Sequence, residues 1–263
     1  MPKSPSLPAN LKQMLVKGNE LFLPGISIDC VIFGFHENTL RILLLDVSVS
    51  NKWSVPGGFV LKNEDLDAAA YRVLKERTGL EDIFLQQFNV FGHPNRIEAL
   101  AHKANFDQYG TKLSKDHWLL KRFVSVGYYA LIDYTNYSIL NDSTFSVNSW
   151  IGIEHLSKLS FDHDHDSIVK KALESLRTQL AYLPIGKNLL PKKFTMPELQ
   201  KLYETILNKP LDRRNFQRKM LGFGILNKLN ETRKGGAHKA PYLYSFNDKK
   251  YQKALKEGLY GSW

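Results

Sequence analysis

The sequence predicts an α+β protein with two domains, the second a small winged helix-turn-helix. A strand, a loop and a helix follow one another over residues 57–80, among several β-rich runs. Two helical segments and a hairpin follow in the last third of the chain. The net charge of +10 also concentrates there, since residues 190–263 hold 16 Lys and Arg against 6 Asp and Glu. A basic appendage on a neutral domain is typical of nucleic-acid-binding proteins.

The first part of the chain combines β-rich runs with a central helix. An amphipathic opening covers residues 11–23, and a turn at residues 36–38 joins the first two strands. The helix of residues 66–77 ends before Gly79, which suits a C-terminal cap. A second helix, over residues 167–182, closes the domain. The predicted strands are residues 27–35, 40–46, 84–91, 123–133 and 147–153.

Two polar segments interrupt this pattern. Residues 97–118 show little periodicity and are predicted to form an inserted loop. Residues 162–166, Asp-His-Asp-His-Asp, open the second helix. Because acidic residues at a helix start cap it and compensate its dipole, we favour a structural role for this cluster over a metal site.

The composition excludes several classes of protein. The single cysteine, Cys30, lies in an apolar run, which excludes a disulfide framework and indicates a buried thiol. Prolines and charges interrupt residues 1–23, unlike a signal peptide, and no run reaches the roughly 18 apolar residues of a membrane span. We therefore expect a cytoplasmic protein that does not associate with a membrane.

Helix-start signals predict two helices in the last part of the chain, after a connector over residues 183–194. Thr195 and Glu198 have the spacing of a capping box, with Pro197 in the first turn of a helix that runs to residue 207. Asp212 caps a second, basic helix over residues 213–221. Strands at residues 225–230 and 242–246 flank a glycine-rich, basic tip. This order is that of a helix-turn-helix followed by a wing.

The second helix of this domain carries side chains that can read DNA bases. Arg suits guanine, and Asn or Gln suits adenine, whereas Lys and Arg of the wing and connector suit phosphate contacts. The alternative is a solvated basic face on a protein-interaction module. The predicted DNA-contacting residues are Lys192, Lys193, Arg213, Arg214, Asn215, Gln217, Arg218, Lys219, Arg233, Lys234 and Lys239.

The strand, loop and helix of residues 57–80 resemble the Nudix box. Its pattern is Gly, five residues, Glu, seven residues, and then Arg-Glu-apolar-any-Glu-Glu-any-Gly-apolar. The matching positions are Gly58, Glu64, Arg72, Leu74, Glu76, Gly79 and Leu80. The resemblance implies that the first domain is a Nudix-like mixed-sheet α/β/α sandwich.

The same box departs from the pattern where the chemistry lies. Three carboxylates on one helix face hold Mg²⁺, which polarises a diphosphate and orients water. The three positions here are Val73, Glu76 and Arg77. Since a valine cannot coordinate a metal and an arginine repels one, we predict a degenerate box with no metal, no cofactor and no catalytic residue. The alternative is an active hydrolase of a nucleoside diphosphate derivative, with carboxylates from elsewhere and an accessory winged helix.

The two parts together resemble the Nudix-related transcriptional regulators, on the motifs of residues 188–195 and 212–216. The resemblance implies a ligand-sensing domain over residues 1–186 and a DNA-binding domain over residues 187–263, acting as a homodimeric repressor on operator DNA. Effectors in this family are ADP-ribose or pentose sugars. Residues 28–35 and 127–132 look closer to the sugar-responsive branch, which controls carbohydrate metabolism. The expected effector contacts are Trp53, Phe59, His93, Asn95 and Arg96.

Overall fold

The computed structural model divides into two compact units. It describes residues 9–47, 52–81, 83–96, 103–104, 106–107, 110–136, 146–180, 184, 187, 189–233 and 240–258. The first unit comprises residues 1–34, 41–131 and 135–172, and the second comprises residues 35–40, 132–134 and 173–263. The domain boundary expected after residue 186 stays a prediction.

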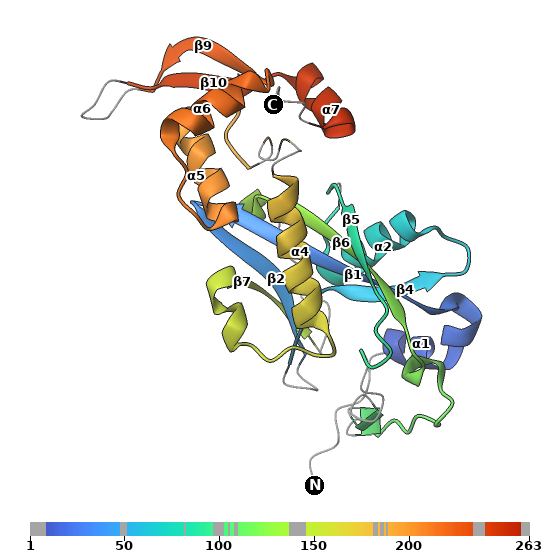
Figure 1. Ribbon diagram of the computed structural model, residues 1–263. Helices are drawn as coiled ribbons and strands as arrows, with labels where there is room; N and C mark the ends of the chain where they lie inside the picture. Colours follow the sequence, from blue (N-terminus) through green and yellow to red (C-terminus); the bar gives the residue numbers. More distant parts are fainter. Residues whose placement is uncertain are drawn as a thin grey trace. The chain divides into compact units, whose positions relative to one another are not determined.

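A seven-stranded sheet forms the centre of the first unit (Figure 1). Its central path runs β3-β2-β1-β6-β5, with β4 paired to β1 and β7 paired to β2. The sheet elements are β1 (Phe22–His36), β2 (Thr39–Val47), β3 (Lys52–Ser54), β4 (Gly57–Leu61), β5 (Gln86–Phe91), β6 (Val124–Ile132) and β7 (Ser146–Gly152). Residues 28–35 of β1 are buried without interruption, because helices cover both faces of the sheet there. Glu37 and Asn38 have φ of 45° and 62°, the conformation of the tight turn that joins β1 to β2.

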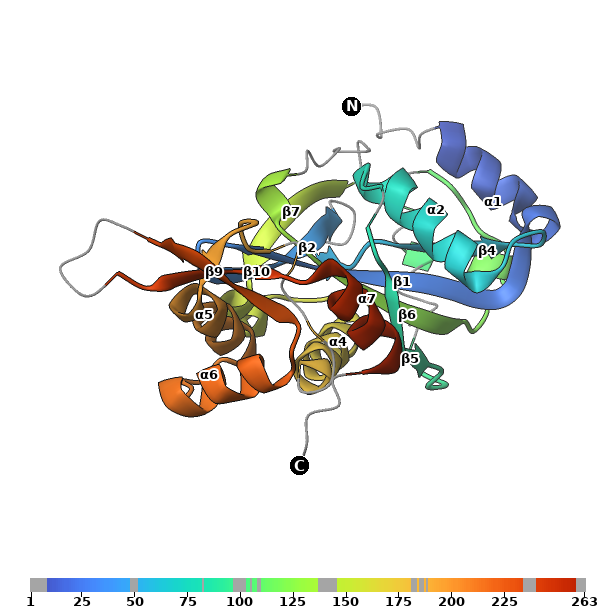
Figure 2. The ribbon, with the colours of Figure 1, turned by 90° about the horizontal axis from the view of Figure 1, so that it is seen from above.

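Helices α2 (Leu66–Thr78) and α4 (His165–Gln179) lie on opposite faces of this sheet (Figure 2). Asp65 caps α2 by accepting a hydrogen bond from the Ala68 amide, and Gly79 ends it at φ 74°. The predicted helix and its glycine cap are therefore confirmed. The arrangement is the mixed α/β sandwich expected from the sequence. Cys30 is fully buried, and this burial raises the pKa of its thiol.

The segment before β6 contributes to the core more than its polar composition indicates. Of the predicted loop over residues 97–118, the structure describes only part. The described part carries Leu113 and leads into a 3-10 helix, η1 (Trp118–Leu120). Trp118 is buried against α1 (Ala9–Leu21), and its Nε1 donates to the Leu15 carbonyl at 3.2 Å. A Cβ on Gly18 would meet the Trp118 ring at 2.1 Å, so only glycine admits this close approach. Two further 3-10 turns are η2 (Tyr134–Asn136) and η3 (Ile153–Lys158).

The second unit contains a helix-turn-helix and a three-stranded sheet of order β8-β10-β9. Its elements are β8 (Phe194–Thr195), α5 (Met196–Leu207), α6 (Arg213–Gly222), β9 (Leu226–Thr232), β10 (Tyr242–Phe246) and α7 (Asp248–Glu257). The capping box of Thr195 and Glu198 and the Asp212 cap are confirmed. Phe216 and Met220 of α6 are buried, whereas Leu221, one position beyond Met220, is 42% exposed. The sequence did not predict β8 or α7.

None of the helices in the described part of the chain has the length and apolar character needed to cross a bilayer.

Candidate functional sites

The matching residues of the box form one ion-paired network. The Arg72 guanidinium donates to both oxygens of Glu64, to the Phe59 carbonyl at 2.7 Å and to Glu76 at 3.0 Å. Glu64 also accepts a 2.7 Å bond from the Leu61 amide. The hydrogen bonds from Arg72 lower the pKa of Glu64, and those to Glu64 raise the pKa of Arg72. These residues therefore fasten the loop after β4 onto α2.

The other two metal positions of the box cannot supply oxygen ligands. Val73 is 1% exposed and packs against Gly58, where a Cβ would lie 2.8 Å from a valine methyl. Arg77 is half-buried, and its Nε donates to the Gly57 carbonyl at 3.0 Å. Among the described residues, no group of three or more His, Cys, Asp or Glu could hold a metal ion. The side chains at the box thus do not fit Mg²⁺, which requires several oxygen ligands.

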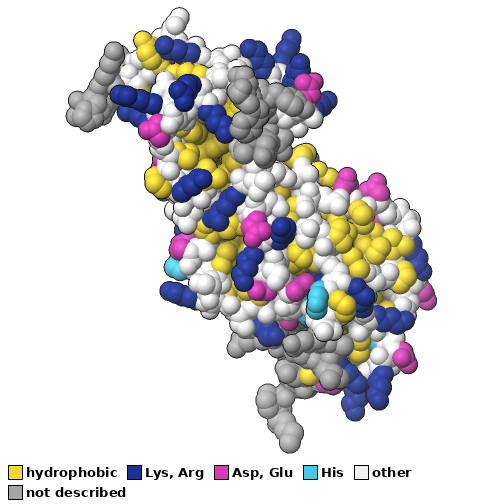
Figure 3. Space-filling view, viewed as in Figure 1, with side chains coloured by type: hydrophobic (Ala, Val, Ile, Leu, Met, Phe, Trp, Pro, Cys, Tyr) yellow, Lys and Arg dark blue, Asp and Glu magenta, His cyan; other side chains and the backbone are white. Residues whose placement is uncertain are grey.

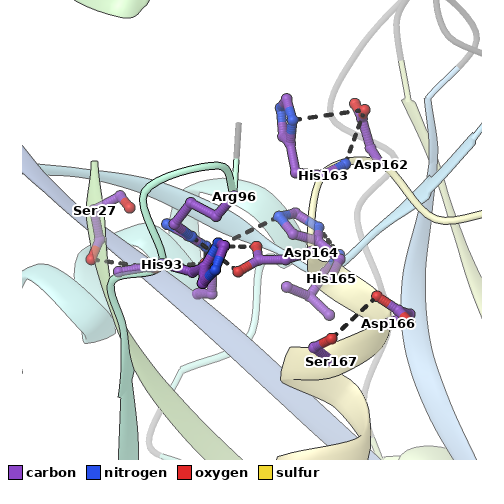
Figure 4. Close-up of polar contacts among 12 residues, drawn as sticks. Ser27, His93, Arg96, Asp162, His163, Asp164, His165, Asp166 and Ser167 are labelled. Carbon is purple, nitrogen blue, oxygen red and sulfur yellow. Dashed lines mark hydrogen bonds and ion pairs between the residues drawn. The ribbon is translucent and has the colours of Figure 1, made fainter. Parts of the chain in front are cut away.

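A second, buried charge cluster lies where β1, β6 and the start of α4 meet (Figure 4). Arg96 donates to the two oxygens of Asp164 at 3.0 and 2.8 Å and to Asp29 at 3.4 Å. The side chains of Arg96 and Asp29 are 4% and 8% exposed. Ser125 donates to the same Asp29 oxygen, and the His165 ring lies 3.8 Å from the other. The Arg96 charge is therefore matched by two carboxylates and shielded from water.

The segment before α4 is fastened to the strand that precedes the box. The Trp53 amide donates to the Ser160 carbonyl at 2.8 Å, and the Asp162 amide donates to the Trp53 carbonyl at 2.9 Å. The Val55 amide donates to Nδ1 of His165 at 3.1 Å. Burial lowers the pKa of His163, which favours its neutral form. The Asp-His cluster of residues 162–166 thus takes part in packing and ion pairing.

The five predicted effector contacts fall into different surroundings. Phe59 belongs to an aromatic cluster, with ring centroids 4.8 Å from Trp118 and 5.4 Å from Phe22. His93 and Asn95 are exposed in the turn that ends with Arg96, whose amide donates to the His93 carbonyl. Through the segment at residues 160–165, the structure links Trp53 to Arg96, whereas Phe59 packs among other aromatic rings.

A hollow at the box helix α2 is lined by a different set of residues. It has a volume of about 510 Å³ and contains none of the five predicted contacts. Its lining is Tyr71, Arg72, Leu74, Lys75, Leu80, Glu81, Ile83 and Phe84.

Two residues of the buried cluster, Asp29 and Ser125, were not predicted from the sequence. Asp29 is the one acid within the apolar run of residues 27–35, and this isolation was the available signal. Ser125 carried no signal, because serine is common in strands of either exposure. The long-range partner of Asp29 could not be read from its neighbours in the chain.

The basic helix α6 presents most of its predicted DNA contacts to solvent. Arg213, Arg214, Arg218 and Lys219 are exposed, and Gln217 is half-buried. The side chain of Asn215 is exposed and accepts a 2.9 Å bond from Arg218. Because Phe216 and Met220 occupy the buried face, Arg214 and Arg218 lie on the opposite face, and Arg213 and Lys219 are exposed at the edges of the buried one.

The predicted phosphate contacts near the wing differ in whether an acidic residue pairs with them. Lys193 pairs with Glu231 at 2.7 Å, and Arg233 pairs with Glu198 at 3.0 Å, so both charges are balanced within the unit. Lys192 is exposed. Lys234 and Lys239 lie outside the described residues. Figure 3 shows several Lys and Arg side chains on this unit with few acidic side chains among them.

Comparisons with known proteins cover both units. Residues 23–172 match the family model of the NUDIX domain, and residues 186–246 match that of the NrtR DNA-binding winged helix domain. An Acinetobacter baylyi protein named ADPR responsive transcriptional repressor NtrR is 31% identical over 229 residues, which is 85% of this chain and 82% of that protein.

Solved structures share the fold. Shewanella oneidensis NrtR complexed with a 27mer DNA is 22% identical, with a TM-score of 0.61 over 86% of this chain and 95% of that one. A MutT/nudix family protein from Enterococcus faecalis is 21% identical, with a TM-score of 0.59 over 91% of this chain and 94% of that one. At these identities the likeness concerns the fold alone.

Proposed function

Because the chain belongs to the Nudix family, in the branch of NrtR-type regulators with a C-terminal winged helix, we propose that it is an ADP-ribose-responsive transcriptional repressor. The observation that carries this proposal is the 31% identity to the ADPR responsive repressor of Acinetobacter baylyi, which extends over 85% of this chain. The alignment is too long to lie within either domain alone. Both the sensing part and the DNA-binding part therefore have a counterpart in that regulator.

The effector we propose is ADP-ribose in place of the pentose sugar favoured from the sequence. The comparisons give the sugar-responsive branch no support, whereas the aligned repressor is named for ADP-ribose. A nucleotide of this kind offers a base for stacking and a diphosphate for cations. Trp53, His93 and Asn95 are suited to contact it directly, since they are at least partly exposed. Phe59 and Arg96 are engaged in packing and ion pairs, which suits them to position the site.

We further propose that the site senses its ligand without hydrolysing it. Hydrolysis by the Nudix route needs a metal that polarises the diphosphate and orients water. At the box, Glu76 pairs with Arg72, Val73 is buried, and Arg77 is a cation. No set of oxygen ligands for that metal is present among the described box residues.

In the DNA-binding unit, α6 is suited to lie in the major groove. Its exposed arginines, Asn215 and Gln217 have the groups that pair with guanine and adenine. Lys192 is suited to a phosphate, which positions the protein without reading sequence. A homodimer would place two such helices on half-sites about 34 Å apart or a multiple of it.

A gel-shift experiment tests the proposal. The DNA upstream of the protein's own gene is titrated with the full chain at two salt concentrations, with and without ADP-ribose. We expect a complex that persists at the higher salt and an affinity that ADP-ribose changes by about 5- to 150-fold, the usual range of allosteric coupling. AMP and arabinose are the controls. An affinity that responds to arabinose and ignores ADP-ribose, or release of phosphate-bearing products from ADP-ribose with Mg²⁺ at an enzyme-like rate, contradicts the proposal.

A further inference from the structure

We propose that the second unit holds a ligand site of its own, a hollow beside α6 that binds a small aromatic carboxylate. The hollow has a volume of about 510 Å³ and is lined by the end of α4, the end of α5, the turn after it and α6. All of its lining residues belong to the second unit. The site therefore differs from the effector site proposed for the first unit, and its existence requires no assumption about ADP-ribose.

The floor of the hollow is apolar and contains two aromatic rings. Leu180, Tyr203, Phe216 and Met220 line it, and each is at most 6% exposed. The rings of Tyr203 and Phe216 meet edge to face, with centroids 5.3 Å apart. Sites for small molecules are typically hollows of about 300–1,000 Å³ with mainly apolar and aromatic linings. Because aromatic rings pack favourably on one another, a flat aromatic ligand suits this floor.

The polar part of the lining carries an excess of positive charge. Arg177, Lys209 and Lys219 belong to it, and Asp212 is the one carboxylate among the described lining residues. Asp212 is already used at the start of α6, where its side chain accepts the Asn215 amide at 2.8 Å. The charge around the hollow therefore favours a ligand that is an anion.

The contacts that these cations make are with neutral groups. The Nε of Arg177 donates to the Ile206 carbonyl at 2.9 Å, which holds the guanidinium at the end of α5. The ammonium of Lys219 lies 5.7 Å from the centre of the Phe223 ring. In the described part of the chain, neither side chain has a carboxylate partner. A ligand carboxylate can thus bond to them without breaking an ion pair.

The site shares residues with the predicted DNA-binding surface. Asn215 and Lys219 line the hollow, and both are among the predicted DNA contacts. A carboxylate that pairs with Lys219 competes with a DNA phosphate for the same charge. Bound ligand should therefore weaken the complex with DNA, a consequence that rests on the proposed function because it presupposes DNA binding.

Calorimetric titration of the full chain with 2-naphthoate and with the neutral 2-naphthamide tests the site. We expect the acid to bind about tenfold more tightly than the amide, the factor of one charge-assisted contact. Arg177→Ala should remove that advantage and leave the affinity for the amide unchanged, which a purely structural effect would not do. Thr178→Trp fills the hollow from an exposed lining position and should abolish binding of both compounds. Lys201→Ala is the control for loss of charge, since Lys201 is exposed on α5 outside the lining.

Three results overturn the site: no binding of 2-naphthoate by the wild type, equal affinity for acid and amide, or a Thr178→Trp variant that binds as the wild type does. Thermal unfolding of each variant checks its fold, and if Thr178→Trp does not fold, the comparison of acid and amide in Arg177→Ala decides alone.

Gel shifts with the DNA upstream of the protein's own gene test the coupling. We expect 2-naphthoate, and not the amide, to weaken the complex by about fivefold or more. An unchanged affinity at saturating 2-naphthoate overturns the coupling. A chain that binds 2-naphthoate as expected but forms no specific complex with DNA overturns the proposed function and the coupling, and it supports the site.

Discussion

Replacing Arg96 by methionine should destabilise the first unit more than any other single change in the buried cluster. The substitution keeps side-chain bulk but leaves Asp29 and Asp164 without their shared counter-charge. Asp29 is 8% exposed, so water cannot take the place of the guanidinium. Breaking a buried pair by removing one partner costs about 3–5 kcal/mol. For a unit of this size that corresponds to a fall of about 10 °C in the unfolding midpoint.

Asp164→Asn provides the comparison. Arg96 then keeps its 3.4 Å contact to Asp29, and the amide can still accept one hydrogen bond. We expect a loss of about 1–2 kcal/mol, close to the value of one hydrogen bond to a charged group. We therefore expect Arg96→Met to be clearly more destabilised than Asp164→Asn.

Tryptophan fluorescence during urea unfolding measures this difference in the right unit. Trp53, Trp118 and Trp150 belong to the first unit, and Trp263 is the fourth tryptophan of the chain. A Trp263→Phe background therefore confines the signal to the first unit. Equal midpoints for the two variants, or a lower one for Asp164→Asn, would refute the idea that Arg96 neutralises both carboxylates.

Three further outcomes follow from the structure. Lys192→Ala should weaken binding to all DNA sequences alike and reduce the salt slope of the affinity by about 1. Arg214→Ala should lower the binding free energy at a cognate site by about 1–3 kcal/mol and relax the sequence preference. Gel shifts at several salt concentrations measure both effects. Arg72 lowers the pKa of Glu64 from its ordinary 4.5, so the stability that Glu64 confers is fully present above pH 4.5 and is lost as pH falls through the lowered pKa. The difference in unfolding midpoint between wild type and Glu64→Gln should therefore shrink below pH 4.5. A difference that stays constant with pH would contradict this. Thr195→Ala removes the side chain that accepts a hydrogen bond from the Glu198 amide, and it should destabilise the second unit by about 1 kcal/mol. Thermal unfolding followed by circular dichroism measures this change. A variant as stable as the wild type would be the contrary result.

The features that could best be predicted from the sequence are those whose signals are local, such as the ends of helices. The Asp212 cap, the capping box of Thr195 and the glycine at the end of α2 each depend on residues within one helical turn. The helix α7 had such signals too, since Asn247 accepts from the Lys250 amide and Gly258 ends the helix, but its apolar residues are few. The two-residue strand β8 is too short for any period to be detected.

The contacts around the candidate site could not be predicted from the sequence because its bonds are long-range. Arg96 was chosen as a ligand contact for its place after β5, yet its partners lie 67 and 68 positions away in the chain. Phe59 was chosen for its place in the box, and its aromatic partner Trp118 comes from a segment with no periodicity. Proximity of this kind follows from the order of strands in the sheet, which spacing along the chain does not reveal.

The box itself shows why fold and chemistry could be predicted separately from one motif. The glutamate and arginine that keep the pattern, Glu64 and Arg72, bond to each other and to the loop after β4, so the shape of the motif depends on them. The positions that depart from it, Val73 and Arg77, are filled by side chains that fit their surroundings without any metal: one packs on Gly58, and the other bonds to the Gly57 carbonyl. A strand, loop and helix can thus stay in place while the side chains at the metal positions change. The box therefore keeps its shape while two of its three metal positions hold a valine and an arginine in place of carboxylates.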